Sequence, residues 1–200
     1  METITNINQL DFNKRYTYAD YLTWQFEEMV ELIRGKLFKM SPAPNSYHQE
    51  LSGNLSGLLW NALRRSPCKV FDAPFDVRLP SKKDGETIYT VVQPDICVIC
   101  DISKIDKRGC LGAPNLIIEI LSQSTAQKDI KDKFEIYQEA GVKEYWIIHP
   151  EEQTLLIYTL DTAGIYQPSR LLTKGDTVGV GVVEGLTINL DEVFTPNIYE

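Results

Sequence analysis

The sequence predicts an α/β (α+β) fold in which a mixed central β-sheet is flanked by helices and followed by extra C-terminal strands. Strand-like apolar runs fill the middle of the chain, an amphipathic helix pattern precedes them, and a strand, helix, strand order covers residues 115–149. With 200 residues and 43% apolar content, the chain is long enough for one sizeable core. We therefore expect a single domain over residues 1–200.

The N-terminal part is predicted to form a helix, a hairpin and a second helix. Thr17, with Asp20 three residues later, favours a helix start, and the helix is expected over residues 17–27. Two short apolar runs in EMVELIRGKLFKM are separated by the sequence RGK, which predicts a hairpin. Apolar residues between 51 and 62 recur at the i, i+4, i+7, i+8 spacing, which predicts an amphipathic helix over residues 46–63.

The remainder is predicted to be strands around one helix. KVFDAPFDVRL, TIYTVVQPDICVIC and NLIIEIL are strand-like runs, and VKEYWIIH and QTLLIYTL predict two more strands around a turn at Pro150. The helix between them is expected to be capped by Ser124 or Thr125 and to end at Gly141. This order suggests a right-handed crossover, so the sheet is not expected to be purely antiparallel.

Composition and charge exclude some classes of protein. A net charge of -8 argues against non-specific coating of nucleic acid, which depends on Lys and Arg, but it does not exclude an enzyme whose site is made of carboxylates. Neither an export signal nor a membrane-spanning run is expected. Four cysteines in a chain of this length do not suggest a disulfide scaffold, so a reducing cytoplasm is the expected location.

Cys97 and Cys100 are not expected to share a zinc ion. At this spacing within a strand, their side chains point to opposite faces.

Two acidic residues stand in strand-like runs where structure alone does not require them. Glu119 is enclosed by apolar residues in LIIEIL, where an unpaired carboxylate would cost several kcal/mol. Asp95 follows a proline between apolar runs, and Asp is depleted in strands. Taken singly, each residue has an equally good structural explanation, a turn end or a solvated strand face. Together they predict a site for a hard metal such as Mg²⁺, which prefers a few carboxylates plus waters.

Lys133 is the third candidate. It shares a stripe with Ile130, Phe134 and Tyr137, whose spacing is that of the core-facing side of a helix. The lysine could extend its ammonium group to water, or pair with Asp129 for only about 0.2 to 0.5 kcal/mol. A third alternative directs it toward the end of the preceding strand, where it would meet a carboxylate, a water or a phosphate.

These residues resemble the PD-(D/E)XK nuclease superfamily, with Pro94 and Asp95 as its first half. PDICVIC followed by GAPNLIIEILSQSTAQKDIKDKFEIYQEAGVKEYWIIHP is similar to the Uma-type restriction-endonuclease-like family, as are ELIRGKLFKMSPAPNSYHQE and PFDVRL. The resemblance covers about residues 15–160. It implies a restriction-endonuclease-like core in which Asp95 and Glu119 hold a divalent metal, Mg²⁺ or Mn²⁺.

The superfamily pattern departs at Leu121, which occupies the usual position of the lysine. This implies either a lysine that has moved to the helix, with Lys133 as the candidate, or an impaired site. The resemblance also adds Glu31 as a possible outer acidic residue of the metal site and His48 as a catalytic candidate. A lone histidine near a helix start has a second interpretation as a cap or surface residue.

The leading hypothesis is a metal-dependent DNA endonuclease that hydrolyses phosphodiester bonds. The alternative is a catalytically silent nuclease-fold module that binds nucleic acid or protein. A hydrolase of a small phosphorylated substrate has less support, because the sequence offers no nucleotide-binding loop. A homodimer is a further possibility, since a two-fold dimer is the simplest way to cut both strands of a symmetric duplex.

Overall fold

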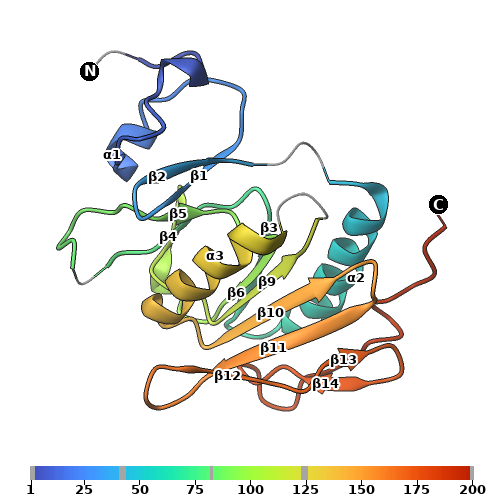
Figure 1. Ribbon diagram of the computed structural model, residues 1–200. Helices are drawn as coiled ribbons and strands as arrows, with labels where there is room; N and C mark the ends of the chain where they lie inside the picture. The colour runs from blue at the N-terminus through green and yellow to red at the C-terminus, as the bar shows by residue number, and fades with distance from the viewer. Residues whose placement is uncertain (1–2, 41–43, 82, 123–125, 199–200) are drawn as a thin grey trace.

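The structure is a computed structural model that describes residues 3–40, 44–81, 83–122 and 126–198. Within the last helix, side chains are described from Lys131 onward. The predicted caps Ser124 and Thr125 lie outside the described residues. The α-helices of the described chain are α1 (Tyr18–Tyr21), α2 (Ser46–Leu63) and α3 (Ala126–Ala140) (Figure 1).

The larger sheet contains the predicted strand, helix, strand unit. β9 (Leu116–Ile120) and β10 (Glu144–His149) pair in parallel and are joined through α3, which ends at Gly141 as predicted. The other strands of this sheet are β3 (Lys69–Asp72), β6 (Ile96–Ile99), β11 (Thr154–Leu160), β12 (Tyr166–Pro168) and β13 (Leu172–Thr173). Their order is β12-β11-β10-β9-β6-β3, with β13 paired to β11. Every pairing apart from β9 with β10 is antiparallel within the described residues, so the sheet is mixed, as predicted.

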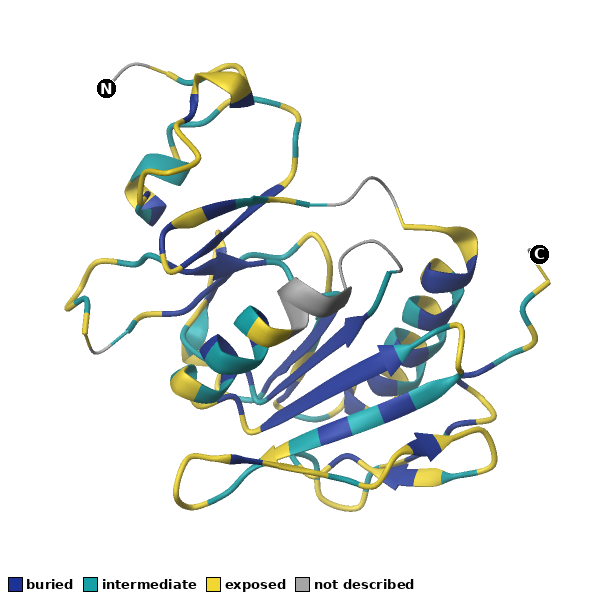
Figure 2. Cartoon of the chain, viewed as in Figure 1, coloured by how far each residue is buried: buried dark blue, intermediate teal, exposed yellow. Residues whose placement is uncertain are grey.

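The larger sheet is covered on both faces. Ile118 packs in the core cluster that contains the leucines of α2, whereas its neighbour Ile117 packs with Ile136 and Tyr137 of α3. Figure 1 shows the two helices on opposite sides of the sheet, and Figure 2 shows β9 buried along its length. Any ionisable group on β9 is therefore removed from bulk water.

The second sheet meets the same helix. Its strands are β1 (Val30–Ile33), β2 (Lys36–Lys39), β4 (Val77–Arg78), β5 (Val91–Val92), β7 (Ile105–Asp106) and β8 (Gly109–Leu111), and their order is β2-β1-β5-β4-β8-β7. Ile33 and Val92 of this sheet share a core cluster with Ile136 of α3 and Ile117 of the larger sheet. The face of α3 thus lies where the two sheets come together.

The predicted hairpin, long helix and C-terminal strands are confirmed. Arg34 and Gly35 connect β1 to β2 with positive φ values of 52° and 83°, which suit a two-residue hairpin turn. The long helix has the predicted bounds and is capped by Asn45, whose side chain accepts a hydrogen bond from the backbone of His48. A small C-terminal sheet adds β14 (Thr177–Gly179) and β15 (Thr187–Asn189).

The first predicted helix is wrong in its extent. Thr17 and Asp20 form the predicted capping box, but α1 ends at Tyr21 instead of continuing to residue 27. Gln25 donates its backbone N–H to the carbonyl of Ile4 at 2.7 Å, so the following segment pairs with the N-terminal segment.

Two of the predicted strands each divide between the sheets. KVFDAPFDVRL forms β3 of the larger sheet and β4 of the second sheet, and the break includes Pro74. TIYTVVQPDICVIC divides in the same way into β5 and β6 around Pro94. Proline cannot donate to a ladder, so each break falls at a residue that interrupts pairing.

Cys68 and Cys100 are joined by a disulfide, contrary to the expectation of reduced cysteines. Lys69 pairs with Ile99 in the antiparallel register of β3 and β6, so the next residues outward, Cys68 and Cys100, face each other. Cys97 lies in the core cluster of α3 and Cys100 packs against that of α2, which confirms that they point to opposite faces.

No helix in the described part of the chain combines the length and apolar character that a membrane crossing requires.

Candidate active site

Asp95 and Glu119 face each other across two neighbouring strands. Ile96 pairs with Ile118 in the antiparallel register of β6 and β9, so the next positions, Asp95 and Glu119, are opposite. Cys97, two residues after Asp95, packs in the cluster that contains Ile117, two residues before Glu119. Because strand side chains alternate with a period of two, Glu119 belongs to the sheet face that α3 covers, and Asp95 lies next to it, one residue before β6 begins.

Lys133 places its ammonium group directly at Glu119. Its Nζ atom is 3.0 Å from Oε1 of Glu119 and 3.1 Å from Oε1 of Glu31, and all three residues are at most 9% exposed. Of the three alternatives for this lysine, the structure shows the contact with carboxylates. The side chain of Asp129 lies outside the described residues.

Glu31 comes from β1, in the second sheet. Besides the contact with Lys133, its Oε1 atom accepts a hydrogen bond of 2.8 Å from the backbone N–H of Gln93, just before Pro94 and Asp95. Glu31, Glu119 and Lys133, which together with Asp95 we call the carboxylate cluster, therefore join the two sheets through α3.

Tyr137 belongs to this cluster, although the sequence indicated only a core residue. Its hydroxyl donates a 2.7 Å hydrogen bond to Oε1 of Glu119, and the residue is fully buried. Its position four residues after Lys133, on the same helical stripe, is the signal that could have identified it.

His48 reaches Asp95 from the other face of the sheet. Its Nε2 atom is 3.0 Å from the carbonyl oxygen of Ile120 and 3.5 Å from Oδ1 of Asp95. The Oδ2 atom of Asp95 accepts a 2.7 Å hydrogen bond from the N–H of Ile120. His48 is 8% exposed, so the interpretation as a surface residue is wrong.

Burial and excess negative charge dominate the electrostatics. Burial raises the pKa of Glu119 to about 7, with Asp95 and Glu31 adding to the shift and Lys133 opposing it. Burial alone would lower the pKa of Lys133, but the charges of Glu119 and Glu31 outweigh it and raise that pKa. Burial alone would likewise lower the pKa of His48, but the hydrogen bond with Asp95 and its charge outweigh burial and raise that pKa. Two carboxylates, those of Glu31 and Glu119, thus contact one buried ammonium group, and the charge of Asp95 adds to the negative potential at Glu119.

The donor set fits a divalent cation held by few protein ligands. Within the described chain, no group of three or more His, Cys, Asp or Glu side chains is arranged to hold a metal ion. Mg²⁺, however, often binds through one or two carboxylates and several waters. Asp95 and Glu119 provide two such carboxylates, opposite each other on adjacent strands.

Leu121, at the usual lysine position, packs instead against the core. It is partly buried in the cluster of α3, and its N–H donates to the carbonyl of Ile148 at 2.9 Å. The ammonium group near Glu119 therefore comes from the helix and not from the strand.

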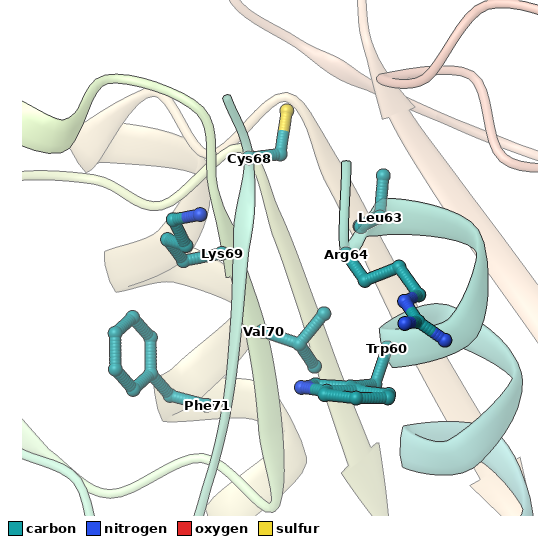
Figure 3. A pocket seen from close by; sticks show the side chains of 7 residues that line it. All are labelled: Trp60, Leu63, Arg64, Cys68, Lys69, Val70 and Phe71. Carbon is teal, nitrogen blue, oxygen red and sulfur yellow. The ribbon is translucent and has the colours of Figure 1, made fainter. Parts of the chain in front are cut away.

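A separate hollow lies near the end of α2 and contains none of the predicted site residues. Figure 3 shows its lining side chains on α2 and β3 and on the segment between them. Its volume is about 180 Å³, and the lining residues are Trp60, Leu63, Arg64, Cys68, Lys69, Val70 and Phe71. Lys69 pairs with Ile99, at the end of β6 opposite from Asp95. This hollow is therefore distinct from the carboxylate cluster.

The chain is similar to known proteins in sequence and in fold. The family model of Uma2, described as "Putative restriction endonuclease", matches residues 18–191. The crystal structure of "a putative nuclease belonging to DUF820" from Anabaena variabilis superposes with a TM-score of 0.70 at 20% identity, over 90% of this chain and 97% of that one. This likeness confirms the predicted restriction-endonuclease-like fold class.

Two curated relatives are uncharacterized proteins of Synechocystis sp. The protein slr1290 is 28% identical over 120 residues, which are 59% of this chain and 60% of that protein. The protein sll1609 is 31% identical over 140 residues, which are 68% of this chain and 75% of that protein. The match thus spans less than two thirds of the first of these relatives.

Proposed function

The chain belongs to the Uma2 family, and from this premise we propose that it is a metal-dependent endonuclease that hydrolyses phosphodiester bonds in DNA. The observation that carries the proposal is the pair of carboxylates Asp95 and Glu119, opposite each other on β6 and β9, with the Lys133 ammonium 3.0 Å from Glu119.

Asp95 and Glu119 are the proposed ligands of Mg²⁺ or Mn²⁺. When bound, such an ion would supply an activated water and would stabilise charge that develops on the scissile phosphate. A bound cation would also lower the pKa of Glu119, which burial raises and the charges of Asp95 and Glu31 raise further.

Lys133 is the proposed partner of the attacking water or of a phosphate oxygen. Its ammonium group already contacts Glu119 and Glu31, so it is held in place before substrate arrives. Glu31 and Tyr137 are positioning residues, because they contact Lys133 and Glu119 respectively. His48 is proposed to orient Asp95 through its contact at 3.5 Å.

We further propose one domain over residues 1–200, acting as a homodimer. Two copies related by a two-fold axis would place one site on each strand of a symmetric duplex.

The test is cleavage of supercoiled, linear duplex and single-stranded DNA by the purified chain with Mg²⁺ or Mn²⁺. We expect wild type to nick or cut at least one of these forms, and chelation of the metal to stop it. Asp95→Asn keeps an oxygen for the N–H of Ile120 but removes the charge, so it should abolish cleavage without unfolding the protein. Glu192→Gln, on an exposed C-terminal residue, should cleave like wild type. A wild type that is inert on all forms with both metals would refute the proposal.

The second candidate function is a silent nuclease-fold module. One observation favours it: Oε1 of Glu119 already accepts from both Lys133 and Tyr137, so this carboxylate is engaged in a complete internal network. Calorimetric titration with Mn²⁺ separates the two functions. A nuclease should bind Mn²⁺ in wild type and lose the binding in Asp95→Asn, whereas a silent module should show no binding that depends on Asp95.

A further inference from the structure

A second pocket, of about 320 Å³, lies beside the carboxylate cluster. It is formed where the chain passes from β3 to β4, from β5 to β6 and around the turn between β7 and β8. Its lining is Pro74, Phe75, Asp76, Gln93, Asp106, Lys107, Arg108 and Gly109. None of these residues belongs to the proposed metal site.

Gln93 connects this pocket to the active site. Its backbone N–H donates to Oε1 of Glu31 at 2.8 Å, and Glu31 contacts Lys133. Its side chain turns to the pocket, where Nε2 donates to Oδ1 of Asp76 at 2.9 Å. One residue therefore contacts both the cluster and the pocket, and it lies two positions before Asp95 in the chain.

The polar atoms of the pocket include acceptors that are not engaged. Within the described residues, Oε1 of Gln93 is buried without a hydrogen-bond partner. Only the Oδ1 atom of Asp76 receives hydrogen bonds there, from Gln93 and, at 3.4 Å, from the hydroxyl of Tyr21. Burial raises the pKa of Asp76, and the hydrogen bonds from Gln93 and Tyr21 and the charge of Arg78 only partly offset that shift. A ligand that donates hydrogen bonds would satisfy these oxygens.

The pocket also has an aromatic wall. Phe75 is partly buried and is stacked on Phe71 with ring centroids 4.1 Å apart and planes 9° apart. Phe71 therefore supports one face of the Phe75 ring. Such a supported ring is suited to stack against a nucleobase.

A basic turn borders the pocket. Lys107 and Arg108 are exposed between β7 and β8, and Asp106 fixes the turn by accepting from the backbone N–H of Arg108 at 2.8 Å and from Arg78 at 2.7 Å. On a chain with a net charge of -8, two adjacent cations at a pocket favour contact with phosphate.

We propose that this pocket binds a base of the DNA strand next to the scissile phosphate and selects a base that carries an exocyclic amino group. Asp76 and Gln93 accept hydrogen bonds from the amino group, Phe75 stacks on the ring, and Lys107 and Arg108 contact the flanking phosphates. The inference rests on the proposed function, because it takes the ligand to be the DNA that the cluster would cut.

The test measures binding of labelled trinucleotides to wild type by fluorescence anisotropy, with chelator present so that no cleavage occurs. Cytosine and uracil differ at C4, where one has an amino group and the other a carbonyl, and adenine and hypoxanthine differ in the same way at C6. We expect the amino base of each pair to bind about tenfold more tightly. Equal dissociation constants within both pairs would overturn the proposal. Equal binding of dCMP and the cytosine trinucleotide would overturn the assignment to a DNA strand.

Variants then test the individual contacts. Asp76→Asn keeps an oxygen that can accept from Gln93, but its amide nitrogen donates hydrogen bonds. The ratio of the dissociation constants for the cytosine and uracil trinucleotides should therefore come close to one. Phe75→Leu should weaken the binding of all the trinucleotides, whereas Phe12→Leu, which changes an exposed aromatic residue, should leave their binding unchanged. Lys107→Ala should weaken all trinucleotides and reduce the salt dependence, while Lys174→Ala, at another exposed turn, should change neither.

The wild-type comparison is decisive even where a variant fails to fold. A base preference without metal-dependent cleavage would support the pocket and refute the proposed nuclease. Cleavage without a base preference would support the nuclease and refute the pocket.

Discussion

The ammonium group of Lys133 lies 3.0 Å from the carboxylate of Glu119, although the two residues are fourteen positions apart on different elements. The same nitrogen is 3.1 Å from Glu31. A buried cation between two buried carboxylates has no water to replace a lost partner. Its removal should therefore affect folding as well as any catalysis.

Lys133→Met should lower the free energy of unfolding by about 3 to 5 kcal/mol, because it leaves two buried carboxylates without their counter-ion. Methionine has similar length and fills the same space, so the loss reports charge and not a cavity. Urea denaturation followed by circular dichroism measures it.

Lys131→Met is the matched control for this variant. Lys131 lies on the same helix but is exposed, so the change should stay within about 0.5 kcal/mol. If Lys133→Met were as stable as Lys131→Met, the buried ion pairs would not exist in solution.

Tyr137→Phe should destabilise the protein by about 1 to 3 kcal/mol, because its hydroxyl donates to a buried carboxylate at 2.7 Å. Tyr145→Phe is a close comparison. Both tyrosines are fully buried, and their rings contact each other with centroids 5.1 Å apart, but within the described residues the hydroxyl of Tyr145 has no partner. Tyr145→Phe should therefore lower the free energy of unfolding by less than about 0.5 kcal/mol. Thermal and urea unfolding of both variants checks the difference, and equal losses would contradict the Glu119 contact.

With one disulfide and two free cysteines, the number of thiols that react in the denatured protein can be predicted. Protein denatured without reductant should show two reactive thiols, Cys97 and Cys110, and reduction should raise the count to four. A chromogenic disulfide reagent gives the count. Protein freshly isolated from cells and alkylated at once should show the same two thiols. Four thiols in that sample would mean that Cys68 and Cys100 are reduced in the cell, as is usual in the cytosol.

The folded protein should also be slow to alkylate. Burial raises the pKa of Cys110 to about 11, so its reactive thiolate is scarce at neutral pH and increases only as the pH approaches 11. Burial raises the pKa of Cys97 as well. Rapid reaction of either thiol in folded protein near neutral pH would contradict their burial.

Elements formed by neighbouring residues were predictable from the sequence. The leucine spacing that predicts the helix lies within residues 46–63, and the turn sequence that predicts the hairpin lies at Arg34 and Gly35. Pairings between distant segments were not predictable from the sequence, because they depend on which strands become neighbours and in which register. The division of TIYTVVQPDICVIC between two sheets and the meeting of Cys68 with Cys100 are both of this kind.

The candidate site shows the same limit. Glu119 and Asp95 could be selected because a carboxylate in an apolar strand requires compensation, and Lys133 because it interrupts an apolar stripe. Tyr137 gave a weaker signal, its position four residues after Lys133 on the same stripe, because an aromatic residue also fits a core. Asp76 and Gln93 are ordinary loop residues in sequence, and only the close approach of β4 to β8 reveals a pocket around them.

That close approach makes Gly109 essential to the pocket and gives a final prediction. Gly109 has a φ of +116°, and a Cβ atom there would lie 2.1 Å from the carbonyl oxygen of Asp76. Gly109→Ala must therefore displace the backbone of either strand, at a cost of about 2 kcal/mol or more. Gly53→Ala is the opposite case, because this exposed helical glycine has no atom within 4 Å of the added Cβ, and it should stabilise the protein by about 0.5 to 1 kcal/mol. Urea unfolding should show shifts of opposite sign, and a neutral Gly109→Ala would mean that β8 does not approach Asp76 as described.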